Sequence, residues 1–334
     1  MPSAITVVDL NTVLVADSNN ARIQKCTRSY GAVVDTMAPN VFNESWACIT
    51  FAGTTFDGQN DSYHFNQLIA LAWDGVHKRL YVSENWLNAF KVLDEYGKLI
   101  AVVGEENNYG TSNTMFGTVT GLGIDPSGNV YAVDHNSDRV QKYIPAYSPL
   151  EFAGQMGGTI DRLSGDGAYL YANLGARLAV FGLTAPAAPA LLGTSDLLPG
   201  TLTANPVLTG GAVFALTSDN ALRAFSVADP AHPTQVGMLP IIQPVGLGGL
   251  DGWLFTVSCC GWGPGWNGQR LYAIDGHDPA HPVVKGWLTL DQFNNVNDWY
   301  VEKIEVQHGT DGTYNIYLAA HEAGVLRVSF NQAA

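Results

Sequence analysis

The sequence predicts an all-β protein, a single seven-bladed β-propeller built from four-stranded antiparallel blades. Three observations favour this architecture: hairpin-like segments recur along the whole chain, the repeat is roughly 48 residues long, and glycine is abundant, with 36 in 334 residues. One four-stranded unit cannot bury both of its faces, whereas a closed ring of such units covers them and leaves no open end. Two β-sandwiches that meet near residue 157 are the alternative.

The first half of the chain repeats one pattern three times. Each copy alternates apolar and polar residues, passes through Asp, Asn or Ser residues that favour turns, and alternates again, as a β-hairpin does. The three hairpins are VLVADSNNARIQKC (13–26), LYVSENWLNAFKVL (80–93) and VYAVDHNSDRVQKY (130–143). Strands are expected before them at 5–9, 68–74 and 119–125, and after them at 48–53, 99–104 and 150–157. Each unit therefore has four strands.

The second half repeats a different unit four times. A Pro-x-x-Pro motif begins at Pro186, Pro230 and Pro279, and an apolar run that ends in glycine follows each one. Proline cannot donate to the hydrogen-bond ladder of a sheet, so each motif is expected at a turn or at a strand start. Hairpins are expected at 168–181, 212–225, 253–274 and 314–330. The last unit has no visible outer strand, so we expect an open edge there and a chain trimmed of an upstream strand and a signal peptide.

The first three units resemble NHL repeats, and the last four resemble LVIVD repeats. VLVADSNNARIQKC and VYAVDHNSDRVQKY carry the first resemblance, and FSVADPAHPTQVG (225–237) carries the second. The chain then divides into NHL-like blades 1–3 (1–156) and LVIVD-like blades 4–7 (157–334) of one propeller (1–334). The resemblance implies the fold but hardly the function. NHL-type propellers include binding scaffolds, lyases and hydrolases, and LVIVD repeats occur mostly on bacterial surface proteins without a settled activity.

Composition excludes several classes of protein. Only 14% of the residues are charged and 46% are hydrophobic, which is incompatible with a disordered chain. A net charge of −14 argues against nucleic acid as a partner, because the protein would repel phosphates. No run of 18 apolar residues occurs, so no membrane span is expected.

The four cysteines favour an extracellular, cell-surface or periplasmic location. Cys26 and Cys48 flank the stretch 27–47, and pairing them would close the base of that stretch. Cys259 and Cys260 are adjacent, so we expect a vicinal disulfide if the compartment is oxidising. Two glycosylation sequons, at Asn43 and Asn60, add weak support for secretion.

Polar residues gather in the loops between the second and third strands, which lie on one face of a propeller. A divalent cation, Ca or Zn, could be held there at the channel mouth. The candidate ligands are Asp17, Glu84, His135, His321 and Glu322. Asp, Asn and Ser are also the residues that hairpin turns prefer, so a purely structural role is the alternative.

The segment SCCGWGPGWNGQ (258–269) is the most distinctive in the chain. A rigid disulfide beside exposed indoles would suit the apolar face of a sugar or an aromatic ligand. Packing of these tryptophans against a neighbouring blade is the alternative. The predicted ligand-binding residues are Trp86, Asp219, Asn220, Cys259, Cys260, Trp262 and Trp266.

Three functions are compatible with these features. The first is a non-enzymatic extracellular binding or structural protein that takes a glycan, a peptide or a protein on its loop face. The second is a metal-assisted lyase or hydrolase with its site at the channel mouth. The third is a subunit of an extracellular assembly or filament, which joins its neighbour through the open edge of blade 7.

Overall fold

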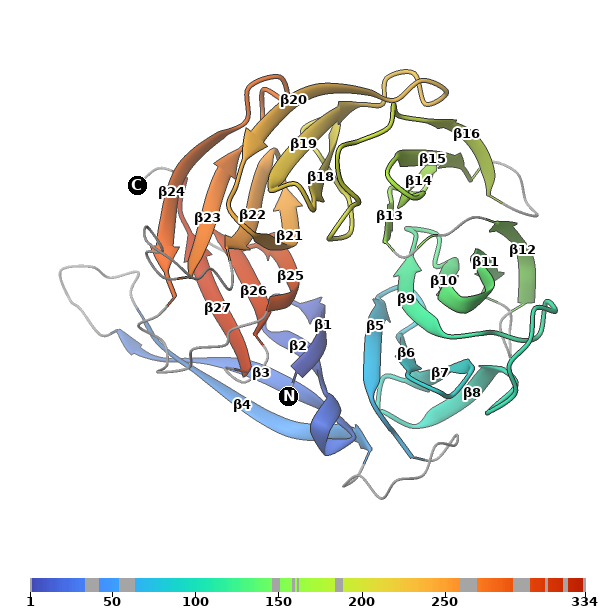
Figure 1. Cartoon of the computed structure of the whole chain (residues 1–334). Helices are drawn as coiled ribbons and strands as arrows, with labels where there is room; N and C mark the ends of the chain where they lie inside the picture. Colours follow the sequence, from blue (N-terminus) through green and yellow to red (C-terminus); the bar gives the residue numbers. More distant parts are fainter. Residues whose placement is uncertain are drawn as a thin grey trace.

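The computed structural model describes residues 2–33, 42–53, 64–145, 151–157, 160, 162–183, 189–258, 269–290, 301–309, 312–320 and 324–332. These residues form seven antiparallel sheets, arranged as a ring around a central channel (Figure 1). Six sheets have four strands, and the last has three. The predicted seven-bladed propeller is therefore confirmed, and two separate β-sandwiches are excluded.

Blades 1–3 contain twelve strands and two short 3-10 turns. Blade 1 is β1 (Pro2–Asp9), β2 (Thr12–Asp17), β3 (Arg22–Val33) and β4 (Phe42–Gly53), with η1 (Ser18–Asn20) between β2 and β3. Blade 2 is β5 (Leu68–Asp74), β6 (Arg79–Glu84), β7 (Ala89–Asp94) and β8 (Leu99–Gly104). Blade 3 is β9 (Val119–Ile124), β10 (Val130–Asp134), β11 (Arg139–Ile144) and β12 (Glu151–Gly157), with η2 (His135–Ser137) after β10.

Blades 4–7 contain the other fifteen strands. Blade 4 is β13 (Leu163–Gly165), β14 (Tyr169–Asn173), β15 (Leu178–Gly182) and β16 (Ala190–Thr194). Blade 5 is β17 (Val207–Thr209), β18 (Ala212–Thr217), β19 (Ala221–Ser226) and β20 (Thr234–Pro240). Blade 6 is β21 (Pro244–Leu250), β22 (Trp253–Ser258), β23 (Arg270–Asp275) and β24 (Val283–Thr289), and blade 7 is β25 (Val301–His308), β26 (Tyr314–Ala320) and β27 (Gly324–Phe330).

The hydrophobic core is divided among the seams between neighbouring blades. The second strands β2, β18 and β22 are buried at every position, because a blade on each side covers both faces of the strand. At the seam between blades 2 and 3, the rings of Phe90, Phe116 and Tyr143 pack with centroids 5.6–6.2 Å apart. No helix of the described residues is long and apolar enough to span a membrane.

Close packing between blades explains two of the three glycines that end apolar runs in the second half, Gly193 and Gly237. A Cβ atom on Gly193 would lie 1.9 Å from the carbonyl oxygen of Ala231, in the Pro-x-x-Pro turn of the next repeat. A Cβ on Gly237 would likewise lie 2.1 Å from the carbonyl oxygen of Pro279. Only glycine permits these approaches, so β16 packs closely on the Pro-x-x-Pro turn of blade 5, and β20 packs closely on that of blade 6.

The stretch 27–47, which the sequence presents as an irregular excursion, is largely a continuation of the sheet. β3 and β4 pair beyond the disulfide, with Thr27 opposite Ala47 and Arg28 opposite Trp46. The hairpin extends from blade 1 toward blade 7 (Figure 1), where the Trp46 ring meets Tyr317 edge to face at 5.9 Å. This contact between blades 1 and 7 stabilises a hairpin that turn residues alone would not reveal.

Candidate functional site

The two faces of the ring carry different connections. Because the strands of each blade are antiparallel, the turn between its second and third strands lies on the same face as the crossover to the next blade. We call this the loop face and the other the opposite face. The loop face includes the described segments 18–21, 64–67, 85–88, 105–118, 135–138, 174–177, 195–206, 218–220 and 241–243.

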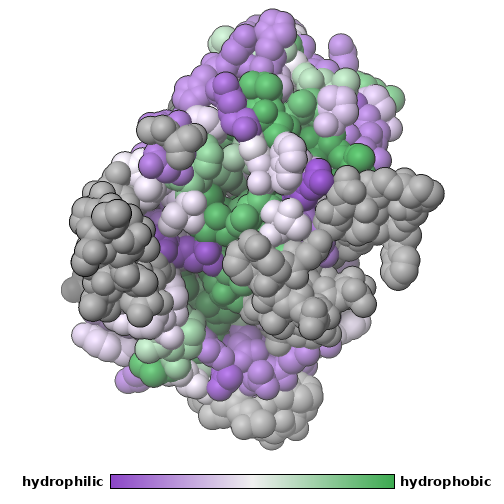
Figure 2. Space-filling model, turned by 90° about the vertical axis from the view of Figure 1, so that its left-hand side faces the viewer, coloured by the Kyte–Doolittle hydropathy of each residue, from purple (hydrophilic) through white to green (hydrophobic). Residues whose placement is uncertain are grey.

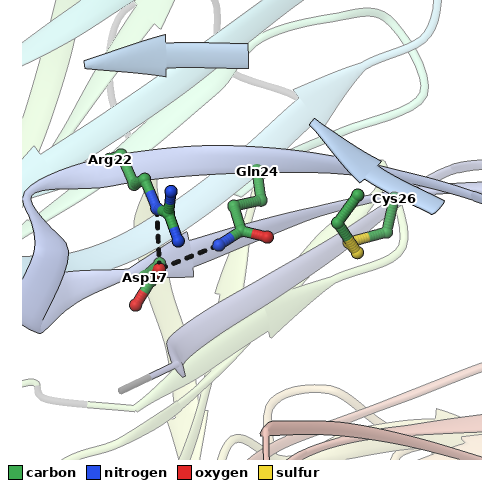
Figure 3. The surroundings of a disulfide bond; sticks show 5 residues. Asp17, Arg22, Gln24 and Cys26 are labelled. Carbon is green, nitrogen blue, oxygen red and sulfur yellow. Dashed lines mark hydrogen bonds and ion pairs between the residues drawn. A yellow bond between two sulfur atoms is a disulfide. The ribbon is translucent and has the colours of Figure 1, made fainter. Parts of the chain in front are cut away.

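Asp17, at the end of β2, is held by three side chains of its own blade. Its carboxylate accepts hydrogen bonds from Asn20 Nδ2 at 2.9 Å, and from Arg22 Nε at 2.9 Å and Gln24 Nε2 at 2.8 Å (Figure 3). Burial raises the pKa of Asp17, but hydrogen bonds from these partners outweigh it and lower the pKa to about 2. The carboxylate is therefore ionised and bound within blade 1.

Glu84, at the end of β6, forms a buried ion pair with Lys91 of β7. Both residues are only 1% exposed. The second carboxylate oxygen accepts the backbone N–H of Asn66 at 2.5 Å. The Lys91 ammonium also donates to the carbonyl oxygen of His64 and lies 4.5 Å from the centroid of the Phe65 ring. The pair therefore fastens the segment that leads into blade 2.

Asp134, at the end of β10, repeats this arrangement in blade 3. Its carboxylate accepts Arg139 Nε at 2.8 Å and the backbone N–H of Gly117 at 2.6 Å. The Arg139 guanidinium also donates to the carbonyl oxygens of Thr111 and Met115. In blades 1–3, then, a carboxylate at the end of the second strand binds a donor side chain of the third strand. In blades 2 and 3 the pair also anchors the crossover.

The predicted metal ligands do not come together in the described part of the chain. His135 is exposed in η2, and His321 and Glu322 lie outside the described residues. Among the residues that the structure describes, no three His, Cys, Asp or Glu side chains are placed to hold a metal ion. The two described carboxylates of the predicted set, Asp17 and Glu84, already bind donors of their own blades. The Ca or Zn site stays a prediction.

Trp86 is the most distinctive described residue of the loop face. Its side chain is 67% exposed, and its backbone has φ of +69°, a left-handed conformation that bulky residues rarely adopt. Hydrogen bonds hold the turn on both sides of it. Asn85 Nδ2 donates to Gln67 Oε1 at 3.0 Å, and the carbonyl oxygen of the buried Leu87 accepts the N–H of Asn107 at 2.8 Å. The fold therefore presents this indole to solvent on a fixed turn.

Tyr109 lies in the crossover between blades 2 and 3, two residues after Asn107, and its side chain is also exposed. Its hydroxyl donates to the carbonyl oxygen of Asn136 at 3.2 Å, and Asn136 Nδ2 donates to Thr118 Oγ1 at 2.8 Å. The crossover between blades 2 and 3 therefore links the turn of Trp86 to the turn that follows β10. Two exposed aromatic rings stand on this linked surface.

Asp219 and Asn220 form the turn between β18 and β19. Burial raises the pKa of Asp219, but hydrogen bonds from Thr217 and Arg223 lower it below its ordinary value. Asn220 has φ of +65°, and its side-chain oxygen accepts the N–H of Gln243 at 2.9 Å. Both residues shape the turn, and their predicted contact with a ligand stays a prediction.

Three exposed apolar residues of the loop face were missed by the sequence reasoning. They are Tyr109, Leu197 and Ile242, all in crossovers. The signal was clearest for Tyr109, which stands among polar residues and glycine in ENNYGTSNT (106–114). An apolar residue outside any alternating apolar pattern is not expected in a strand, so its position could have identified it as a surface residue.

The segment 259–268 lies outside the described residues, and so do the predictions made for Cys259, Cys260, Trp262 and Trp266. The vicinal disulfide and the tryptophan platform therefore stay predictions. The other predicted pair is confirmed, because Cys26 and Cys48 form a disulfide between β3 and β4.

The inner strands enclose a central cavity of about 750 Å³. Among the described residues, the buried hydroxyls of Thr120, Ser164 and Thr203 on its wall have no protein hydrogen-bond partner. On the same wall, Lys303 Nζ of β25 forms an ion pair with Glu305 Oε1 of the same strand at 2.7 Å. The channel is therefore polar, and its hydroxyls are suited to water or a small polar group.

Sequence comparison identifies one repeat family in the chain. The NHL repeat matches residues 1–26, which contain β1, β2 and the start of β3 as far as Cys26. The resemblance of the last four blades to LVIVD repeats stays a prediction. Among curated proteins, none matches this sequence significantly.

Solved structures show similarity over the whole ring. The WD40 β-propeller domain of Doa1 superposes with a TM-score of 0.63 at 9% identity, covering 99% of this chain and 93% of that domain. Hydrazine synthase of Kuenenia stuttgartiensis gives 0.62 at 13% identity, covering 100% and 96%. A protein from Lactobacillus plantarum gives 0.60 at 15% identity, covering 86% and 84%. At these identities the likeness shows a shared fold alone, the β-propeller.

Proposed function

We propose that this propeller is a non-enzymatic binding protein whose loop face docks a partner protein, with Trp86 as the central contact. One observation carries the proposal: the indole is exposed while its backbone is held at φ of +69°. A left-handed backbone costs an L-residue about 1–2 kcal/mol. Strain of this kind gathers at ligand-binding sites, where the surrounding structure maintains it.

The surroundings of Trp86 support a role in binding. Tryptophan and tyrosine are the residue types most enriched at the centres of protein interfaces. The hydrogen bonds of Asn85 and Asn107 fix the turn before a partner arrives. A contact that is already ordered loses less conformational entropy on binding, so each buried ring contributes more to affinity.

The spread of exposed apolar residues favours a protein over a single sugar. Tyr109 lies between blades 2 and 3, Leu197 between blades 4 and 5, and Ile242 between blades 5 and 6. A surface that uses them together with Trp86 extends around much of the ring. We include the predicted residues Asp219 and Asn220 at its polar rim.

We also propose that the protein works outside the cytoplasm. The Cys26–Cys48 disulfide supports an oxidising compartment, because such bonds rarely persist where thiols are kept reduced. A glycan or a free peptide as the ligand, and a metal-assisted lyase or hydrolase, are outcomes that the following experiment distinguishes.

The test uses the whole protein as bait for a displayed library of random peptides, followed by a glycan array. We expect selected peptides to bind wild type at least tenfold more tightly than Trp86→Ala. Tyr96→Ala, an exposed aromatic in the β7–β8 turn of the opposite face, is the matched control and should leave binding unchanged.

Two results would contradict the proposal. One is binders that respond to Tyr96→Ala and not to Trp86→Ala. The other is stoichiometric Ca or Zn in the purified protein that His135→Ala removes, which would favour the metal-assisted enzyme. Glycans that bind while no peptide does would replace the partner protein by a sugar.

A further inference from the structure

Blade 7 has an unpaired edge among the described residues. β27 pairs with β26 on one side, and no described strand pairs with its other side. In each of the other six blades, a fourth strand runs antiparallel to the third strand at this position. An unpaired row of backbone N–H and C=O groups is a template for a further strand.

The side chains of β27 alternate between two environments. Leu326, Val328 and Phe330 face blade 6 and pack against its core. Val325 and Arg327 point the other way and line a pocket at the seam with blade 1. A strand added beside β27 would follow the same alternation, with every second side chain directed into this pocket.

The pocket at this seam has a volume of about 280 Å³ and mostly apolar walls. Val13 and Val15 of β2, the Cys26–Cys48 disulfide, Trp46 and Tyr317 form most of these walls. Asp17 and Gln24 lie at its rim, hydrogen-bonded to each other (Figure 3). Seen from the side of β24, β27 and the β3–β4 hairpin, the surface is hollowed, with hydrophobic residues in the hollow (Figure 2).

Other seams between blades contain a side chain at the position that corresponds to this pocket. The fourth strand of the preceding blade contributes an apolar side chain to the core of four seams: Phe51 of β4, Val103 of β8, Leu239 of β20 and Leu288 of β24. At the seam between blades 7 and 1, the described core contains no such contribution. The pocket therefore occupies the place of a fourth-strand side chain.

We propose that the β27 edge and the seam pocket together form a second binding site, which takes one extended segment of a partner polypeptide. The segment pairs antiparallel with β27 and directs an apolar side chain at an alternate position into the pocket, as in β-strand addition. This site is separate from the surface around Trp86 and does not depend on the function proposed above.

The geometry favours a single extended segment over a second copy of this chain. β27 is a third strand, so it lies about one strand spacing, roughly 4.8 Å, inside the rim formed by fourth strands such as β24 and β4. A second β27 is recessed in the same way, and the rim strands of the two propellers would meet first. A single extended strand beside β27 has the width of this one-strand recess.

The probe is a synthetic peptide with the sequence of residues 98–105, KLIAVVGE, which includes β8. The control peptide carries Val103→Asp, because Val103 is the seam residue of β8. Hydrogen exchange of the full-length protein, followed by mass spectrometry, measures protection of the β27 amides. Titration of the labelled peptide measures affinity, and native mass spectrometry measures the oligomeric state.

We expect saturable binding of the probe, with β27 amides that exchange at least tenfold more slowly in its presence. The Asp peptide should bind at least tenfold more weakly. Val325→Lys should weaken binding at least tenfold, whereas Val283→Lys on the exposed face of β24 should not. Should Val325→Lys fail to fold, the two peptides on wild type still decide the question.

Three results would overturn the proposal. The first is equal affinity of the two peptides for wild type. The second is unchanged exchange of β27 at a saturating peptide concentration. The third is protection, in the free protein, of the β27 amides that point away from β26. If the free protein is a monomer, the chain covers its own edge, and if it is a dimer, a second copy occupies the edge.

Discussion

Replacing Lys91 by methionine tests the buried ion pair that holds blade 2 to its preceding crossover. The substitution keeps most of the side-chain volume but leaves the Glu84 carboxylate uncompensated, in a place where both residues are 1% exposed. Breaking a buried pair in this way costs about 3–5 kcal/mol. With an unfolding entropy of about 2.1 cal/mol/K per residue, a chain of 334 residues should lose about 4–7 °C in Tm.

Differential scanning calorimetry and denaturant unfolding of four proteins provide the assay: wild type, Lys91→Met, Glu84→Gln and the double variant. Each single variant leaves one buried charge without its opposite charge. The double variant removes both charges and keeps an acceptor for the Asn66 N–H. The double variant should therefore lose much less stability than the sum of the single variants. Strict additivity, or a loss below about 1 kcal/mol for Lys91→Met, would refute the reasoning.

Three further predictions concern the loop face and blade 1. Trp86→Gly should be more stable than Trp86→Ala by about 1 kcal/mol in denaturant unfolding, because glycine adopts the observed φ of +69° without strain; equal stabilities would remove the argument from strain. Asp17 takes up a proton at its ordinary pKa of 3.8 when unfolded but only at about 2 when folded, so its contribution to stability is complete above pH 4 and is lost as the pH falls toward 2. In acid titrations monitored by circular dichroism, Asp17→Asn should flatten the pH dependence in this window, whereas an unchanged slope would argue against the bound carboxylate. Removing the Cys26–Cys48 bond with paired serines should cost about 3 kcal/mol, and intact mass should rise by about 2 Da on reduction for each disulfide; no change in mass would exclude the pair.

The fold could be predicted because its signals are local and repeated. Alternation, turn residues and the Pro-x-x-Pro motifs at Pro230 and Pro279 mark each hairpin, and the number of repeats sets the number of blades. The extension of β3 and β4 could not be predicted in this way. It depends on the contact of Trp46 with Tyr317, nearly the whole chain length away, which no local pattern encodes.

The candidate site was harder to predict, because a carboxylate has the same appearance in a sequence whether it binds a ligand or a neighbouring strand. The ion pair of Glu84 with Lys91 spans seven positions, and it is visible only when the β6–β7 hairpin is in register. The exposure of Trp86 depends on partners in two crossovers, Gln67 and Asn107, which are distant in sequence from each other. Tertiary contacts decide both roles.

The most direct test of the proposed binding function is the affinity of library-selected peptides for wild type, Trp86→Ala and Tyr96→Ala, measured side by side. A loop-face site predicts that Trp86→Ala weakens binding at least tenfold and that Tyr96→Ala, on the opposite face, leaves it unchanged. Equal affinity for wild type and Trp86→Ala would contradict a binding role for the loop face centred on this residue.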